Sequence, residues 1–182
     1  IGGEIPQHIL NGRMDKAEES VLWFKNLFGE DYYLEIQRHE THDPNAAQDV
    51  YPHQVTANKA ILELARKHNI KVIATNDVHF VNAEDAEAHD RLICLSTGKD
   101  LDDPNRMRYT KQEWMKTTAE MNTIFSDIPE ALSNTLEIAD KVEFYSIDHG
   151  PIMPTFAIPE DFGTEEGYRQ KFTEQDLFDE FT

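Results

Sequence analysis

The sequence predicts an α/β fold built on a parallel sheet, either open or closed into a barrel. Over the first two thirds of the 182 residues, short segments of strand-like composition alternate with longer segments of helical periodicity. The connections between them are short, and a helix between consecutive strands is the usual link in a parallel sheet. Because function in such sheets lies at the carboxyl ends of the strands, we expect the chemistry of this chain there.

The first elements follow the order helix, strand, helix. Apolar residues recur at helical spacing over Met14–Phe28, and Gly29 follows as the expected stop. Residues 32–37 are rich in aromatic and β-branched types, which is typical of a strand. The next helix carries Pro52 in its first turn and is expected to end before Asn69.

A second strand and a third helix are expected next. Residues 71–75 are apolar enough to form a strand buried on both faces. Asn82 is expected to cap the helix that follows. The apolar residues of that helix are expected to face inward, and they are Ala86, Leu92, Ile93 and Leu95.

Helix-start signals continue beyond Gly98. Thr110 with Glu113, and Thr117 with Glu120, each have the spacing of a capping box. Pro129 is expected to open a further helix. A helical segment is therefore predicted to follow the sheet.

The chain is expected to divide into residues 1–143 and residues 144–182, the second part being a linker and the start of another domain. Pro151, Pro154 and Pro159 punctuate the extended stretch of this second part. The chain has no initiator Met and stops within a segment of amphipathic pattern. We therefore expect it to be a piece cut from a larger protein.

The composition excludes several classes of protein. Lys and Arg number 17 and Asp and Glu 35, which gives a formal net charge of −18. A protein that binds a nucleic-acid backbone by itself normally presents an extensive basic surface, and this acidic chain has too few Lys and Arg residues to form one. No apolar run reaches the roughly 18 residues of a membrane-spanning helix. The single cysteine, Cys94, excludes a disulfide framework and is expected to be an inert core thiol in a reducing compartment such as the cytoplasm.

Polar clusters follow both predicted strands, and they contain the candidate metal ligands. His39 comes after the first strand, and Asp77 and His79 come after the second. In extended backbone the Asp-x-His spacing projects both side chains from one face. Mixed imidazole and carboxylate ligands suit zinc, manganese or iron better than calcium, so we expect a divalent metal site. The alternatives are an Asx turn at Asp77 and a hydrogen bond from His39 to a backbone carbonyl.

The one local basic patch contains Arg106, Arg108, Lys111 and Lys116. It could contact a phosphate backbone or an acidic partner, and a solvated surface is the alternative. His89 shares its predicted helix with apolar residues and is expected to be a core histidine with its hydrogen bonds satisfied.

Several stretches resemble a known family when they are taken together. Residues 1–6, 33–39 and 74–80 (the last reading ATNDVHF) resemble the later part of a PHP (polymerase and histidinol phosphatase) domain. The stretches that resemble the alpha subunit of bacterial DNA polymerase III, where it leaves its PHP domain and enters its palm, are residues 101–104, 125–132 and 134–139.

This resemblance implies part of a distorted (β/α) PHP-type barrel, followed by a helical segment and an extended linker. It implies metal-dependent phosphoester hydrolysis and, in some alpha subunits, a 3′→5′ exonuclease. By position His39, Asp77 and His79 correspond to late ligands of the PHP metals, which we expect to be Zn, Mn or Fe. A Mg-dependent centre for DNA-directed DNA polymerase (nucleotidyltransferase) activity is expected outside this chain.

The same resemblance implies partners and alternatives. DNA, a proofreading exonuclease subunit and the sliding clamp are expected to be bound through the parent protein. Most PHP ligands are expected upstream of this chain, so the chain alone is expected to be inactive. The alternatives are a scaffold that docks the proofreading subunit, with vestigial metal residues, and a stand-alone PHP-like phosphoesterase.

Overall fold

The computed structural model describes residues 2–152, 164, 166–167 and 170 of the chain. The chain divides into two units, Ile1–Glu143 and Phe144–Thr182. The first unit contains the helices and strands described below. The assignment of the two parts to a PHP domain and the start of a palm stays a prediction, and Pro154 and Pro159 lie outside the described residues.

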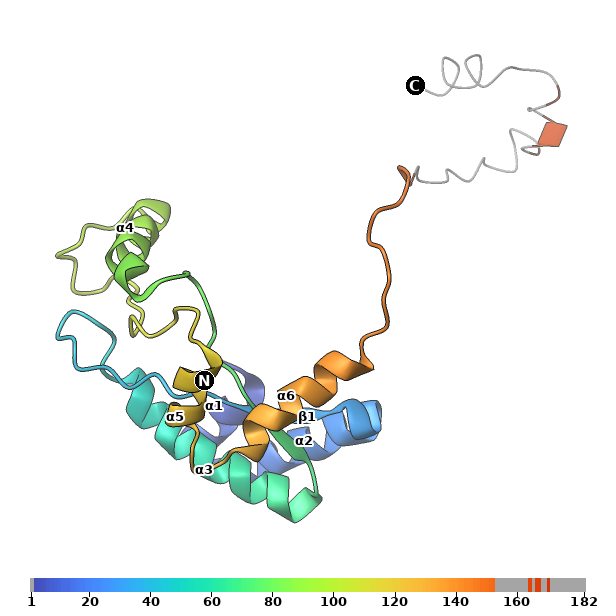
Figure 1. Cartoon of the computed structure of the whole chain (residues 1–182), viewed down its shortest axis with the longest axis horizontal. Helices are drawn as coiled ribbons and strands as arrows, with labels where there is room; N and C mark the ends of the chain where they lie inside the picture. The colour runs from blue at the N-terminus through green and yellow to red at the C-terminus, as the bar shows by residue number, and fades with distance from the viewer. Residues whose placement is uncertain (1, 153–163, 165, 168–169, 171–182) are drawn as a thin grey trace. The chain divides into compact units, whose positions relative to one another are not determined.

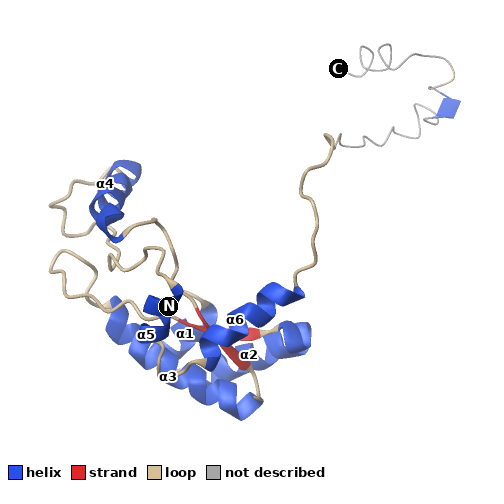
Figure 2. Ribbon diagram, in the orientation of Figure 1, coloured by secondary structure: helices blue, strands red, loops and turns tan. Residues whose placement is uncertain are grey.

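The first unit mixes helices with a small sheet, as Figure 2 shows. This confirms the α/β class, whereas closure into a barrel stays a prediction. In chain order the elements are α1 (Glu4–Leu10), α2 (Met14–Phe28), η1 (Gly29–Asp31), β1 (Tyr33–Ile36), α3 (Val50–His68), β2 (Lys71–Ala74), η2 (Ala83–Asp85), α4 (Ala86–Thr97), α5 (Thr118–Ile124) and α6 (Glu130–Lys141).

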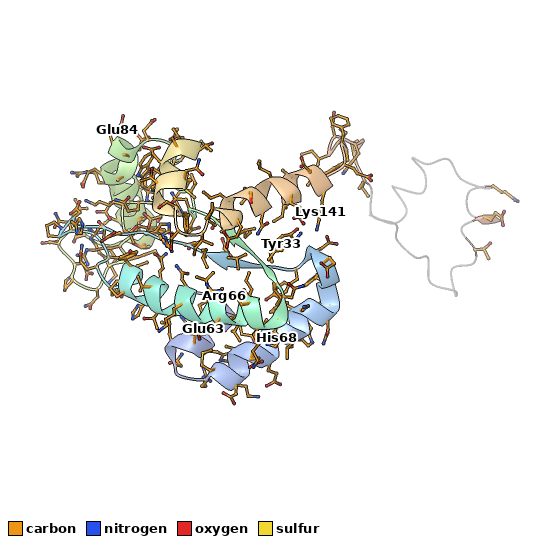
Figure 3. The ribbon with its side chains drawn as sticks, turned by 60° about the horizontal axis from the view of Figure 1, so that its bottom comes forward. Tyr33, Glu63, Arg66, His68, Glu84 and Lys141 are labelled. Carbon is orange, nitrogen blue, oxygen red and sulfur yellow. The ribbon has the colours of Figure 1, made fainter. Side chains whose placement is uncertain are left out.

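The sheet of the described residues consists of β1 and β2, which pair in parallel. The helix α3 connects them, as the alternating sequence pattern predicted. Figure 3 shows α6 on one side of the strands and α3, with α1 and α2, on the other. The alternate residues of the strands point into this layered core and are buried, namely Leu34, Ile36, Val72 and Ala74.

The predicted helix ends are confirmed at several positions. The helix α2 ends at Gly29, whose φ of 58° favours glycine, and α3 ends at Asn69 with φ 51°. The helix α5 begins with a capping box in which Thr117 and Glu120 each accept from the other's backbone N–H, at 3.3 and 2.8 Å. Pro129 stands immediately before α6.

Ion pairs and one ring contact fasten α6 to the strands. The Lys71 ammonium lies 2.6 Å from the Glu137 carboxylate. Lys141 Nζ lies 5.1 Å from the centre of the Tyr33 ring, and Figure 3 shows these two side chains beside each other. No helix among the described residues is long and apolar enough to span a membrane.

The inward face predicted for α4 is wrong at two of its four residues. Leu92 and Leu95 are 62% and 80% exposed, although their pattern predicted an inward face. Asn82 caps the short turn η2 that precedes α4, together with Asp85. Figure 1 shows α4 standing away from the layered body, so the sheet does not offer α4 an apolar partner. Its buried residues are Ala86, as predicted, together with Asp90 and Cys94, and Ile93 is half-buried.

The first predicted capping box does not open a helix. Half of the box is formed: Glu113 Oε1 accepts from Thr110 N and Oγ1 at 3.0 and 2.5 Å, but Thr110 Oγ1 accepts from Gln112 N at 3.1 Å and not from Glu113 N. However, Lys111 has φ 65°, which a right-handed helix does not allow. The segment runs instead as a loop that forms one isolated bridge, between Phe80 and Trp114.

Candidate functional site

The carboxyl ends of β1 and β2 lie side by side, as the sequence predicted. Ile36 is opposite Ala74 in the register, and Thr75 N continues the ladder by donating to Ile36 O at 3.1 Å. Gln37 Nε2 donates to Thr75 Oγ1 at 3.1 Å. Residues that follow the two strands therefore leave from the same edge of the sheet.

His39 lies in the interior behind this edge and is 2% exposed. Its Nε2 is 3.1 Å from the carbonyl oxygen of Asn76, and its Nδ1 is 3.1 Å from Gln54 Nε2. Its backbone N–H donates to Gln54 Oε1 at 2.8 Å. Burial lowers the pKa of His39, and the negative charge of Glu113 opposes this shift. His39 is therefore neutral at pH 7.

Asp77 and His79 lie at the surface of the same edge. Asp77 has φ 46°, a left-handed conformation that Asp tolerates better than most residues. This turns the Asp77 carbonyl towards the His79 ring, where Nδ1 donates to it at 2.6 Å. The side chains are 53% and 31% exposed, and Asp77 Oδ1 lies 3.9 Å from His79 Nδ1.

The His79 ring has the form that metal-binding histidines usually take. Its proton is on Nδ1 and is held by a backbone carbonyl, so Nε2 carries the lone pair. Tyr109 Oη lies 3.2 Å from this Nε2. The rings of Tyr109 and His89 pack around His79, with centroids 4.7 and 5.7 Å from it. His89 is thus a half-buried member of an aromatic cluster.

The predicted ligands fit a metal only in part. Asp77 and His79 could hold one, because the Asp77 carboxylate is exposed and a metal could take the place of Tyr109 Oη at His79 Nε2 on the surface. His39 does not fit, because both of its ring nitrogens already have partners in the interior. Over the described residues, no group of three or more His, Cys, Asp or Glu side chains has an arrangement that could hold a metal ion.

The loop 110–117 lies against the turn that carries Asp77 and His79. Asn76 Nδ2 donates to the carbonyls of Gln112 and Trp114 at 3.0 and 2.7 Å, and His79 N donates to Glu113 O at 2.7 Å. The Glu113 side chain is 3% exposed. Its Oε2 has no hydrogen-bond partner in the part of the chain that the structure describes.

Sequence reasoning missed Gln54 and Tyr109 as members of this site and assigned Glu113 only to a cap. Gln54 had a signal: it stands three residues before Ala57 and seven before Ile61, on the apolar face of α3. A polar residue at a core position needs a buried partner. Tyr109 had no such signal, because its place depends on the path of a loop.

The predicted basic patch is not a surface patch at Arg106, which is buried. Its guanidinium forms two bonds with Asp90, at 2.6 and 2.8 Å. The Lys111 ammonium lies 2.8 Å from Asp43 and also contacts Glu87. Arg108 Nη2 donates to Asp103 O at 3.2 Å. Arg106 and Lys111 connect loops to α4, because their partners Asp90 and Glu87 belong to that helix. A nucleic-acid contact therefore stays a prediction for Arg108 and Lys111 and loses support at Arg106.

Comparison with known proteins gives a consistent family. The chain is 40% identical over 179 residues to the DNA polymerase III subunit alpha of Borreliella burgdorferi, a match that covers 97% of this chain and 15% of that protein. It is 37% identical over 152 residues to the same subunit of Campylobacter jejuni, covering 83% of this chain and 12% of that protein. The match to the Treponema pallidum subunit is 31% identical over 183 residues and covers 100% of this chain and 15% of that protein. No protein-family model matches the chain.

Proposed function

This chain is similar over nearly its whole length to a part of the DNA polymerase III alpha subunits, and on that basis we propose that it works as a segment of a bacterial replicative DNA polymerase. It spans about 15% of the length of the curated relatives it matches. The polymerase activity, with its Mg-dependent centre, belongs in this proposal to other parts of the protein. DNA, a proofreading exonuclease subunit and the sliding clamp are its proposed partners.

Within that protein, the edge that carries Asp77 and His79 contributes to a PHP-type metal site. The observation that supports this role is the Nδ1–H bond from His79 to the Asp77 carbonyl at 2.6 Å, which leaves Nε2 as the nitrogen that could bind a metal in place of Tyr109 Oη. The remaining ligands come from other parts of the longer protein. A bound Zn, Mn or Fe ion would polarise a phosphoryl oxygen and lower the pKa of a water molecule, as 3′→5′ exonuclease chemistry requires.

This chain's own residues prepare that edge in two ways. Asp77 supplies a carboxylate that is exposed and free to bind, and its carbonyl fixes the orientation of the His79 ring. The rings of Tyr109 and His89 pack against the His79 ring, and Tyr109 Oη lies against Nε2, so they limit the directions from which this nitrogen can be reached.

The competing function is a non-catalytic scaffold for the proofreading subunit. The burial of His39 favours it, because one of the three predicted ligands is not available at the edge. The two functions differ in what they require of Asp77 and His79, since a scaffold has no use for their lone pairs.

The test uses the full-length protein that contains this sequence. Asp77→Ala and His79→Ala are expected to lower its content of Zn, Mn or Fe and to abolish 3′→5′ exonuclease activity with Mn²⁺, while polymerase activity persists. His53→Ala, an exposed histidine on α3, is the matched control. If Asp77→Ala changes neither the metal content nor the exonuclease activity, the metal role is wrong and the scaffold remains. The isolated chain is expected to show no turnover in the same assay.

A further inference from the structure

His39 connects three segments that are far apart in the sequence. Its ring lies between Gln54 of α3 and the carbonyl of Asn76, the residue immediately before Asp77. The side chain of Asn76 continues the connection to the carbonyls of Gln112 and Trp114. A continuous set of hydrogen bonds thus runs from α3, through the His39 ring, to the turn and the loop 110–117.

The partners of the ring fix where its proton lies. A backbone carbonyl only accepts, so the nitrogen that faces Asn76 O, Nε2, carries the proton. Gln54 Oε1 already accepts from the backbone N–H of His39, so the group that faces Nδ1 is the Gln54 amide NH₂, a donor. Both ring nitrogens are then satisfied with the ring neutral.

The neighbouring carboxylate does not change this assignment. Glu113 Oε1 lies 3.8 Å from Nδ1, which is too long for a hydrogen bond, and it already accepts from Thr110. Lys116 and Asp77 are the other charged groups that act on the ring, and neither forms a hydrogen bond with it. A metal on His39 would have to displace either Gln54 or the Asn76 carbonyl from a buried position.

We infer that His39 is a positioning residue for the turn that carries Asp77 and His79, not a metal ligand. It holds the Asn76 carbonyl from one side while the Asn76 side chain is held from the other, so the turn begins from a fixed peptide. The benefit of this positioning for metal binding rests on the proposed function, whereas the hydrogen-bonded connection of the turn to α3 through His39 does not.

The first test needs no substitution. In the 182-residue chain with ¹⁵N-labelled histidine, the ring of His39 is expected to show a protonated Nε2 and an unprotonated Nδ1. Addition of Zn²⁺ to the full-length protein that contains this sequence is expected to shift the ring nitrogens of His79 and to leave those of His39 unchanged. A proton on Nδ1, or a shift of His39 that tracks bound zinc, would overturn the inference. If zinc moves neither ring, His39 is still not a ligand, and the proposed metal role of His79 is what fails.

The second test measures the fastening itself by hydrogen exchange. The amides of His79 and Phe80 both bond to Glu113 O, so their protection reports on the turn. His39→Leu is expected to lower that protection at least about tenfold relative to the amide of Val21 in the core. His53→Leu on the exposed face of α3 is the control. Unchanged protection of His79 in a folded His39→Leu chain would overturn the inference.

A further variant covers the case in which His39→Leu does not fold. Gln54→Leu keeps the apolar face of α3 intact and removes the partners of both Nδ1 and the His39 backbone N–H. It is expected to lower the protection of His79 and Phe80 in the same direction. Equal protection in Gln54→Leu and the unmodified chain would count against the fastening.

Discussion

Asp90→Asn tests whether the buried pair with Arg106 holds α4 in place. The two side chains are 11% and 4% exposed. Each carboxylate oxygen accepts one guanidinium N–H, at 2.6 and 2.8 Å. Arg106 Nε also donates to Leu101 O at 2.9 Å, so one cation connects α4 with the loop that follows it.

The expected loss of stability is large because the cation stays buried when its partner changes. The Asn amide has nearly the shape of the carboxylate, but it carries no charge and its NH₂ faces an N–H of Arg106. Removing one partner of a buried ion pair costs about 3–5 kcal/mol, and so little exposure leaves solvent almost no room to screen the remaining charge. We expect a loss of roughly 3 kcal/mol.

The assay combines urea unfolding of the 182-residue chain with hydrogen exchange of the α4 amides. Both are needed because α4 stands away from the layered body and can open without global unfolding. Lys99→Met is the matched control, because Lys99 pairs with Asp103 at 3.0 Å on the same loop with 44% and 25% of the side chains exposed. Its expected cost is at most about 0.5 kcal/mol.

A double variant separates the pair from the packing around it. Asp90→Leu with Arg106→Met leaves no buried charge and is expected to recover most of the loss. If Asp90→Asn costs no more than Lys99→Met, both in urea and in the exchange of α4, the pair does not hold the helix and the argument is refuted.

Three further substitutions test other parts of the fold. Burial raises the pKa of Tyr32 to about 12, above its unfolded value of about 10. The stabilising contribution of the neutral Tyr32 side chain is therefore full below about pH 10 and is lost as the pH rises towards 12. In an ultraviolet titration of the six tyrosines, Tyr32→Phe should remove a late-ionising component, and an unchanged curve would contradict the shift. Thr117→Ala should cost about 1 kcal/mol in urea unfolding by removing the cap of α5, and no loss would contradict the capping role. Phe125→Ala should cost about 3–5 kcal/mol because Phe125 is 1% exposed and carries Arg38 over its ring, and a cost below about 1 kcal/mol would contradict its place in the core.

The parts of the fold that the sequence predicted correctly depend on local rules. The periodic run Met14–Phe28 became α2 with the same bounds, and Gly29 ended it because a positive φ suits glycine. The parallel pairing of β1 with β2 followed from the helix α3 between them, since a crossover connection forces that direction. Each of these features needed only neighbours in the sequence.

The orientation of α4 could not be predicted in this way, because a long-range polar contact decides it. Apolar residues normally identify the buried face of a helix, and on α4 they indicated Leu92 and Leu95. Asp90 instead faces Arg106, which lies 16 residues further along the chain, and one turn of helix then buries Cys94 on the same side. The pair fixes the rotation of the helix, and the two leucines are left in solvent.

For the candidate site too, the sequence predicted at which edge of the sheet the residues lie, but not which of their side chains are buried. The strand-end rule placed His39, Asp77 and His79 at one edge; in the structure Asp77 and His79 lie at its surface, and His39 is buried behind it. The strand-end rule cannot predict which side chain turns inward, because that depends on a hydrogen-bond partner in the interior. Gln54 was the signal that could have decided it: a polar residue on the apolar face of α3 needs a buried polar partner, and the strand end that crosses this helix offers His39. A buried glutamine paired with a strand-end histidine therefore predicts a structural hydrogen bond, and the Asp-x-His that follows the neighbouring strand remains the pair that an ion could reach from the surface.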